Sequence, residues 1–293
     1  MNMSENIKIC VLGGDGRQTA VAQRLGQRYE CAVWGVERVP DTAVRCDDWR
    51  DAVRGADAVV LPLPVSRDGK TLNGSDGVKL NEIVSAMRPS SFLCGGMIPN
   101  SVREMAAERC AAVYDYFESE SVQIRNAVPT AEGTVAALIG EMPVTVDGMT
   151  VLVTGYGRCA RTIAQKLILL GADVYAAARS EKDLAWAWVD GCAAITLDEM
   201  RECPPSCDAV VNTVPVRLID GSVLGKLDSK TVVFDLSGGG VGVDAEAARE
   251  CGIKVIPLPS LPGKTSPETA GNIIADAILR KLGEHFEIGG TSR

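Results

Sequence analysis

The clearest chemical signal in the chain is a glycine turn between an apolar run and a helical pattern. Gly155, Gly157 and Ala160 form G-x-G-x-x-A directly after the predicted strand 150–155. The first glycine permits a tight turn, the second lets the backbone approach a pyrophosphate, and the small third residue lets helix and strand pack closely. The N-terminus of the helix then meets the phosphates. We therefore predict a dinucleotide site made by Gly155, Tyr156, Gly157, Arg158, Cys159 and Ala160.

The end of the next predicted strand, 173–180, bears on which dinucleotide binds. NAD enzymes usually place Asp or Glu there to bind the ribose hydroxyls. This chain has Arg179 and Ser180 instead, and its first acid is Glu181. A guanidinium and a hydroxyl suit a 2′-phosphate, so we predict NADP(H) as the cofactor.

Two later predicted strands end in residues that would meet the same ligand. In open parallel sheets, ligands bind at the carboxyl ends of the strands. The strand 231–238 ends in Ser237 and a run of glycines, which would form a flap over the cofactor. The strand 208–215 ends in Asn212, Thr213, Val214 and Pro215, which we also assign to the cofactor.

A second glycine loop lies near the N-terminus and competes for the same role. Gly14, Gly16 and Thr19 form G-x-G-x-x-T after the predicted strand 7–12, and Glu37 lies near the end of the next strand. Thr is a poor packing residue at the third position, and Asp15 would bring a negative charge to the phosphates. We interpret this loop as facing the substrate. A second dinucleotide site and a purely structural turn are the alternatives.

The apolar pattern indicates the scaffold that carries these loops. Continuous apolar runs alternate with amphipathic helical segments in both halves of the chain, which means parallel sheets covered on both faces. The runs are 7–12, 31–35, 57–64, 91–96 and 111–116, then 150–155, 173–180, 208–215, 231–238 and 253–259. We predict an α/β protein of two doubly wound parallel-sheet domains, the second a Rossmann dinucleotide-binding domain.

The predicted domain boundaries follow from these runs. Residues 1–125 form a Rossmann-like or flavodoxin-like substrate domain, which a C-terminal helix over 267–293 completes. A connecting helix over 126–142, with Thr130 as a candidate N-cap, leads to the NADP-binding domain at 143–266.

Composition excludes several classes of function. The 293 residues include 30 Lys and Arg against 38 Asp and Glu, a net charge of −8 that argues against nucleic-acid binding. No apolar run is long enough to span a bilayer. The ten cysteines are scattered and there is one histidine, so we expect no metal site and a reducing, cytoplasmic location.

A family resemblance emerges when the motifs are taken in order. The segments GGDGRQ, VPTAEGT, TGYGRCART, AAARS and LPSLPGKTSPETAGNIIA cover nearly the whole chain. Together they resemble the dipicolinate synthase A-subunit family of endospore-forming bacteria, whose wider relatives are the two-domain 2-hydroxyacid and alanine dehydrogenases. The chain departs from that family after FDLS, where GGGVGVD replaces the usual Arg-Pro pair and its glycines.

The resemblance implies an activity and its partners. It implies NADP-linked conversion of dihydrodipicolinate to dipicolinate in the mother cell during sporulation. It also implies a partner, the flavoprotein-like B subunit, within a homo- or hetero-oligomer. Two other hypotheses remain open: another amino- or hydroxyacid dehydrogenase, and a non-catalytic NADP-binding regulatory subunit. The first is weakened because the only histidine, His285, lies far from every motif.

The implied dianionic substrate needs positive groups and a proton acceptor. Arg17, beside Gly14 in the first glycine loop, is the leading carboxylate ligand, and Lys264 is the second. At the start of the connecting helix, Thr130 and Thr134 could donate hydrogen bonds to a substrate carboxylate or to the nicotinamide amide. The candidate bases, assigned here as catalytic residues, are Glu132 and Asp15.

Overall fold

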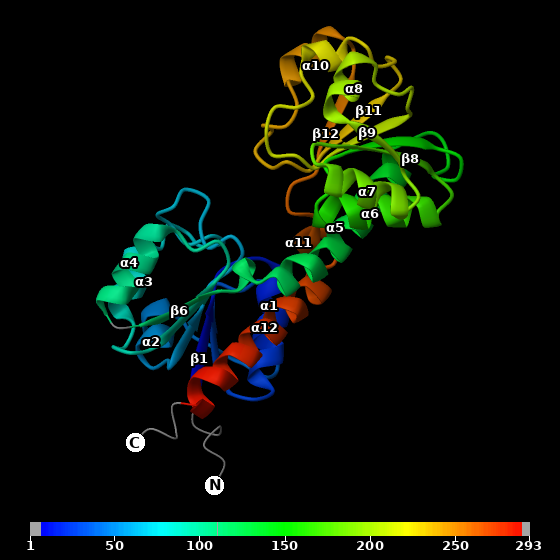
Figure 1. The fold of residues 1–293 in the computed structure, drawn as a ribbon. Helices are drawn as coiled ribbons and strands as arrows, with labels where there is room; N and C mark the ends of the chain where they lie inside the picture. The colour runs from blue at the N-terminus through cyan, green and yellow to red at the C-terminus, as the bar shows by residue number, and fades with distance from the viewer. Residues whose placement is uncertain (1–6, 110, 289–293) are drawn as a thin grey trace. The chain divides into compact units, whose positions relative to one another are not determined.

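The computed structural model describes residues 7–109 and 111–288, which fold into two compact units (Figure 1). Unit 1 combines the described residues up to Asn126 with those from Ser266 onward, and unit 2 spans Ala127–Thr265. Helix α5 (Glu120–Glu141) runs through the boundary. The prediction that Thr130 caps this helix is wrong, because the helix begins ten residues earlier and carries Pro129 in its interior. A proline in a helix interior lacks the N–H of one backbone hydrogen bond, so the helix is continued here through a residue that usually interrupts one.

Unit 1 is built on one parallel sheet with the strand order β3-β2-β1-β4-β5-β6. Alternate residues of β1 face opposite sides: Ile9 and Val11 pack with α1 and α12, whereas Cys10 and Leu12 pack with α2, α3 and α4. The strands are β1 (Lys8–Leu12), β2 (Glu30–Trp34), β3 (Val44–Arg45), β4 (Ala58–Val60), β5 (Phe92–Gly95) and β6 (Ala112–Asp115). The helices are α1 (Gly16–Gly26), α2 (Trp49–Arg54), α3 (Leu80–Ala86), α4 (Asn100–Glu108), the short 3-10 helix η2 (Tyr116–Glu118) and α12 (Pro267–Ile288).

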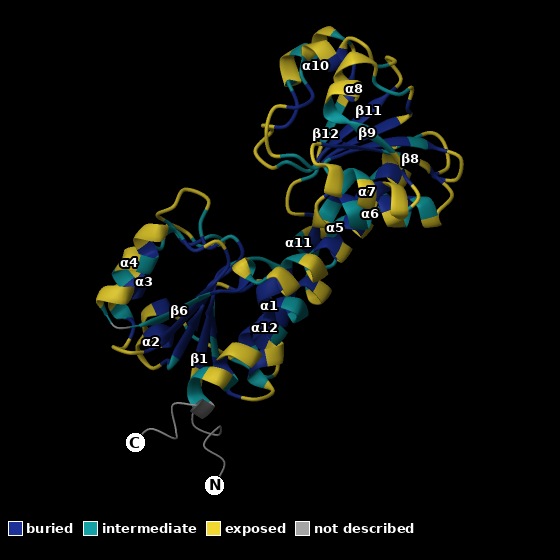
Figure 2. Cartoon of the chain, viewed as in Figure 1, coloured by how far each residue is buried: buried dark blue, intermediate teal, exposed yellow. Residues whose placement is uncertain are grey.

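Unit 2 repeats this architecture, with the order β12-β11-β10-β7-β8-β9. One face of its sheet is covered by α5, α6 and α7 and the other by α8, α9 and α10, so the central strands are buried on both sides (Figure 2). The strands are β7 (Thr150–Thr154), β8 (Asp173–Ala178), β9 (Ala193–Thr196), β10 (Ala209–Asn212), β11 (Val232–Asp235) and β12 (Lys254–Pro257). The helices after α5 are α6 (Arg158–Leu169), α7 (Glu181–Val189), α8 (Leu197–Glu202), α9 (Gly221–Leu224), α10 (Ala245–Glu250) and α11 (Leu261–Thr265).

The prediction of an α/β chain with two doubly wound parallel sheets is confirmed. Each sheet has one strand more than the sequence indicated. Strand β3 has two exposed residues and β9 is a short, alanine-rich edge strand, so neither carries a strong apolar signal. In both sheets the strand order reverses beside the first strand of the unit, between β1 and β4 and between β7 and β10. Ligands of open α/β sheets bind at such reversals, at the carboxyl ends of the strands.

Two features are absent from the described ranges. No helix there combines the length and the apolar character needed to cross a membrane. Nor do three or more His, Cys, Asp or Glu side chains in those ranges come together in a group that could hold a metal ion.

Candidate functional site

The turn between β7 and α6 has the geometry of a phosphate-binding loop. Gly155 has φ +81°, and a Cβ there would lie 3.0 Å from both Thr213 Oγ1 and Val214 Cγ2, so the position requires glycine. Gly157 is the N-cap of α6 and supplies no side-chain cap, and a Cβ there would meet nothing within 4 Å. The space before the helix is therefore open to a pyrophosphate, and the residues fit a bound dinucleotide.

A pocket of about 740 Å³ adjoins this turn. Gly155 and Tyr156 line it from the glycine turn, Ala178 and Arg179 from the end of β8, and Val214 from the loop after β10. The volume is in the range of ligand pockets that enclose a small organic molecule. Its place beside the end of β8 is where the adenosine half of a dinucleotide binds in this fold.

Two arginines and two aspartates give the pocket its charges. Arg179 forms no ion pair with any described residue, whereas Arg201 Nη1 lies 3.6 Å from Asp198 Oδ1. Asp198 and Asp183 are the two aspartates that line the pocket. Sequence reasoning missed Arg201, which α8 brings to the pocket because β9 pairs with β8 in a register that sets Thr196 beside Ala178.

The predicted partner of Arg179 has a structural role as well. Ser180 is the N-cap of α7, and its Oγ accepts a hydrogen bond from the backbone N–H of Asp183 at 3.1 Å. A 2′-phosphate contact by this hydroxyl would share the oxygen with that cap.

Buried polar side chains link the carboxyl ends of β7, β10 and β11. Thr154 Oγ1 donates to Asn212 Oδ1 at 2.6 Å, and Asn212 Nδ2 donates to Asp235 Oδ1 at 2.9 Å. None of the three is more than 4% exposed. Asn212 Oδ1 also accepts from the N–H of Val214 at 3.2 Å, so the network fixes the loop after β10. The sequence analysis did not assign a role to Asp235. An acid at the end of an apolar strand was the signal that could have identified it.

The same network closes the glycine loop that follows β11. Ser237 Oγ donates to Asp235 Oδ2 at 2.9 Å and accepts from the N–H of Gly242 at 3.0 Å. Three successive glycines between these residues, 238–240, have positive φ and are exposed. The predicted contact of Ser237 with the cofactor stays a prediction, and its present partner is Asp235.

A hydrogen bond from Tyr156 fixes the glycine turn of unit 2. Tyr156 is 5% exposed and donates from its hydroxyl to Asp190 Oδ2 at 3.1 Å. Arg161 donates two hydrogen bonds to the same carboxylate, from Nε at 2.6 Å and from Nη2 at 3.1 Å. Burial, followed by contact with Cys192, raises the pKa of Tyr156 well above its ordinary value, so the phenol stays protonated. Tyr156 thus ties the turn to the end of α7.

The corresponding turn of unit 1 is covered at Gly13 and Gly14 by another segment of the chain. The N–H of Gly14 donates to Asn73 O at 2.9 Å, and a Cβ on Gly13 would lie 2.8 Å from the same oxygen. Leu72 is 1% exposed against Gly13, and Gly74 lies against the backbone of Gly14. The segment 72–74 therefore contacts the first glycine loop where a pyrophosphate is predicted to contact the turn of unit 2, which disfavours a second dinucleotide site. It also means that the amide of Gly14 is already bonded.

The predicted carboxylate ligand of unit 1 is held by its neighbours. Arg17 Nε and Nη2 donate to Asp15 Oδ1 and Oδ2 at 2.8 and 2.7 Å, and Nη2 also donates to Leu63 O at 2.6 Å. The Arg17 side chain is 8% exposed, and no described residue accepts from its Nη1. Burial raises the pKa of Asp15, but the hydrogen bonds and charge of Arg17 outweigh it and the pKa lies below its usual value. The two residues therefore remain an ion pair at neutral pH.

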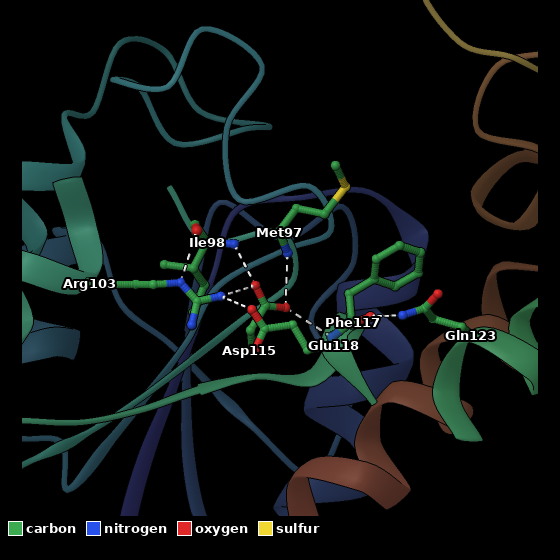
Figure 3. A network of polar contacts seen from close by, with 7 residues as sticks. All are labelled: Met97, Ile98, Arg103, Asp115, Phe117, Glu118 and Gln123. Atoms are coloured by element: carbon green, nitrogen blue, oxygen red, sulfur yellow. Dashed lines mark hydrogen bonds and ion pairs between the residues drawn. The ribbon is translucent and has the colours of Figure 1, made fainter. Parts of the chain in front are cut away.

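A buried carboxylate at the end of β6 organises the neighbouring loop of unit 1 (Figure 3). Asp115 is 4% exposed and accepts from the N–H groups of Met97, Ile98 and Phe117 at 3.0, 2.8 and 2.9 Å. Arg103 Nη2 donates to it at 2.7 Å. The loop between β5 and α4 is thus fixed at the carboxyl edge of the sheet, a feature that the sequence analysis did not identify.

The candidates on α5 and α11 are placed in unit 2. Thr134 is fully buried and donates to Thr130 O at 2.9 Å, within the helix. Thr130 forms a side-chain hydrogen bond with Cys159 in the first turn of α6. Glu132 Oε1 accepts from Lys166 Nζ at 3.0 Å, so its charge is paired. Lys264 is exposed on α11.

Comparisons with known proteins agree with this architecture. Residues 8–117 match the N-terminal domain of the dipicolinate synthase A-subunit family, and residues 111–248 match the NAD-binding domain of D-isomer specific 2-hydroxyacid dehydrogenases. The dipicolinate synthase A-subunit of Bacillus subtilis (strain 168) is 31% identical over 290 residues, which cover 96% of this chain and 98% of that protein.

Solved structures carry the likeness into three dimensions. The A chain of dipicolinate synthase from Bacillus subtilis superposes with a TM-score of 0.83 at 28% identity, over 95% of this chain and 96% of that one. The dipicolinate synthase A-subunit from Bacillus halodurans gives a TM-score of 0.85 at 25% identity, over 96% and 99% of the two chains. The second unit is accordingly an NAD(P)-binding, Rossmann-like domain.

Proposed function

Because the chain belongs to the dipicolinate synthase A-subunit family, we propose that it is the NADP-binding subunit of an oxidoreductase that converts dihydrodipicolinate to dipicolinate (pyridine-2,6-dicarboxylate). Its dehydrogenase-type domain supplies the dinucleotide site. The name of the family implies a partner, the B subunit. The activity, the oligomer that the two subunits form and a role in the sporulating cell are parts of this proposal.

The observation that carries the choice of NADP is the position of Arg179. Its guanidinium lines the same pocket as the glycine turn and forms no ion pair with any described residue. A positive group at the end of β8, where an NAD enzyme has an acid, favours a 2′-phosphate over a bare ribose diol. Arg201 in the same pocket adds a second positive charge.

In this proposal, different residues of the chain bind the dinucleotide and orient the ring of the substrate. The bound dinucleotide supplies the acceptor for the hydride that leaves the dihydropyridine ring. The first turn of α6 and Arg179 hold its phosphates, and the network of Asn212 and Asp235 sets the loops at the carboxyl edge of the sheet. Orientation of the ring is the main requirement, because formation of the aromatic product drives the step.

The proton that leaves the ring needs an acceptor, and Asp15 is our preferred one. It stays ionised beside Arg17, which binds a substrate carboxylate in this scheme through the Nη1 group left outside the Asp15 and Leu63 bonds. Glu132 is the other candidate; like Asp15 it is held in an ion pair, but its partner Lys166 is not one of the proposed substrate ligands. Lys264, exposed on α11, is the second carboxylate ligand of the proposal.

A turnover assay tests the proposal directly. The purified chain, with and without its B-subunit partner, is given dihydrodipicolinate and either NADP⁺ or NAD⁺, and reduced nicotinamide is followed by absorbance. We expect turnover that is faster with NADP⁺ and that yields dipicolinate. Binding of NADP(H) without turnover under either condition would instead favour a regulatory subunit.

A further inference from the structure

Met97 adopts a backbone conformation that its side chain disfavours. Its φ is +59°, and the other described non-glycine residues with positive φ are Ser90 and Ser260, which makes Met97 the apolar member of the set. The Met97 residue is also 58% exposed. Glycine would take this conformation without cost, and the two preceding residues are already glycines. Neither backbone geometry nor core packing accounts for a methionine here.

The surrounding chain holds Met97 firmly in this conformation. Asp115 accepts hydrogen bonds from the N–H groups of Met97 and Ile98, and Arg103 fixes the carboxylate from the other side. Figure 3 shows the Met97 side chain extending away from this network. A strained residue kept in place by a buried carboxylate, with its apolar side chain turned outward, is the kind of outlier that marks ligand-binding positions.

The position of Met97 relative to the substrate ligand is set by backbone contacts. Gly96 donates to Pro62 O at 3.2 Å and accepts from the N–H of Val65 at 2.9 Å, so the Met97 loop runs alongside the segment 62–65. Within that segment, Leu63 O accepts the hydrogen bond from Arg17. Met97 directly follows Gly96, which is hydrogen-bonded to this segment. Met97 and Arg17 therefore lie at the same carboxyl edge of the sheet.

We propose that Met97 contacts the substrate, and that its thioether packs on the face of the planar heterocycle whose carboxylate Arg17 binds. This inference rests on the proposed function. Thioether sulfur makes favourable contacts with aromatic rings, and a flexible, unbranched side chain adapts to a ring that changes from dihydropyridine to pyridine. The contact recognises the ring and not the carboxylates, so it gives specificity for cyclic over open-chain dicarboxylates.

The test compares binding of two probes by the full chain and three variants. Dipicolinate carries the ring, whereas glutarate has the same three-atom spacing between its carboxyl groups without one. Met97→Ala removes the thioether, and Met97→Gly removes it while relieving the left-handed backbone. Ser90→Gly is the matched control, because Ser90 has φ +62° and lies before β5, whereas Met97 lies after it. Dissociation constants are measured by calorimetry and unfolding by a thermal scan.

The expected pattern separates the ring contact from a structural role. Both Met97 variants should raise the dissociation constant for dipicolinate about tenfold and leave that for glutarate unchanged. The control Ser90→Gly should bind both probes as the wild type does. Met97→Gly should unfold at the wild-type temperature or higher, because glycine removes the strain. Unchanged dipicolinate binding in both Met97 variants overturns the inference, and so does an equal loss for both probes, since that would mean an indirect effect through Arg17.

The two levels of the proposal fail in different ways. If ring-selective binding depends on Met97 but no turnover occurs with NADP⁺ or NAD⁺, the subsite stands and the proposed reaction falls. If turnover occurs and Met97 variants lose affinity only for the B subunit, the residue belongs to the protein interface and the inference is wrong.

Discussion

Asn212 and Asp235 lie side by side at the carboxyl ends of β10 and β11, where Asn212 Nδ2 donates to Asp235 Oδ1 at 2.9 Å. Thr154 joins them from β7, so three neighbouring strands end in one hydrogen-bonded group. Both loops that follow β10 and β11 begin from this group, since Val214 and Ser237 bond to it through their N–H groups. The geometry of the predicted cofactor site thus depends on side chains that a bound ligand need not touch.

Replacing Asn212 by Ala should loosen this edge of unit 2. The change removes a donor from the buried carboxylate of Asp235 and the acceptor of Thr154, which costs about 2–4 kcal/mol of unfolding free energy. Hydrogen–deuterium exchange should quicken in β10 and β11 and not in β4. Ser222→Ala, which removes an exposed hydroxyl of the same unit, should leave exchange in β10 unchanged. Wild-type protection in Asn212→Ala would contradict the role of the network.

Replacing Arg179 by Gln should alter the choice of dinucleotide. Loss of a charged hydrogen-bond donor to a phosphate costs about 1.5–3 kcal/mol, so the dissociation constant for NADP should rise at least tenfold while that for NAD stays near wild type. Fluorescence titration with both dinucleotides measures this. The control is Arg249→Gln, an exposed arginine of α10 outside the pocket. Equal losses for NADP and NAD would remove the 2′-phosphate role.

Adding a single methyl group at Gly157 should separate binding from folding. A Cβ there meets no protein atom within 4 Å, so Gly157→Ala should keep the wild-type unfolding temperature. It should nevertheless lower nucleotide affinity at least tenfold, because the methyl group occupies the space through which the pyrophosphate approaches the backbone. Gly155→Ala should lose stability as well, since its φ is positive and the neighbours are 3.0 Å away. Gly140→Ala, also in open space but on α5, is the control and should bind normally. Undiminished binding by Gly157→Ala would place the phosphates elsewhere.

Replacing Arg17 by Ala should weaken dicarboxylate binding and change the acid stability of unit 1. The pKa of Asp15 is lowered in the folded chain, so its ion pair stabilises the fold above the unfolded pKa of about 3.9 and this contribution is lost as the pH falls through the lower folded value. Without Arg17 that pH dependence should shrink. Dipicolinate affinity at neutral pH and unfolding between about pH 5 and 2 test the two effects. Retained dipicolinate affinity would reject Arg17 as a ligand, whatever the stability shows.

The single histidine should give unit 1 a pH dependence near neutrality. His285 packs against Phe92 with ring centroids 4.7 Å apart, and burial, followed by the charge of Lys281, lowers its pKa. The unfolded chain therefore binds a proton more readily, so stability should decline as the pH falls below about 6.5 toward the lower folded pKa. His285→Phe keeps the ring contact and should abolish this slope. A slope that persists in the variant would assign it to other groups.

Sequence periodicity and the glycine turn together predicted the parallel sheets and the dinucleotide-binding unit, because both depend on residues close in the chain. Gly155, Gly157 and Ala160 lie where the local pattern placed them. The extent of α5 was misjudged because Pro129 is tolerated inside the helix, which tertiary packing of residues such as Leu138 supports.

The features that escaped prediction are long-range. Whether the first glycine loop binds a nucleotide depends on Asn73, almost sixty residues away, and on Leu72 beside it. Arg201 reaches the pocket only through the pairing of β8 with β9. The partners of Arg17 include Leu63 O, and no spacing rule connects these two positions. Such contacts follow from the topology of the sheet, which periodicity does not determine.

The segment 72–74 gives the first glycine loop a partner that belongs to the same chain. Because that partner is covalently part of the fold, the N–H of Gly14 is bonded to Asn73 O whether or not a solute is present. The proposed dinucleotide at the turn of unit 2 would instead bind reversibly, to an extent set by its free concentration and its dissociation constant. Two units with the same strand order would thus differ in what their first turn contacts, which is a fixed segment of the chain in unit 1 and an exchangeable ligand in unit 2.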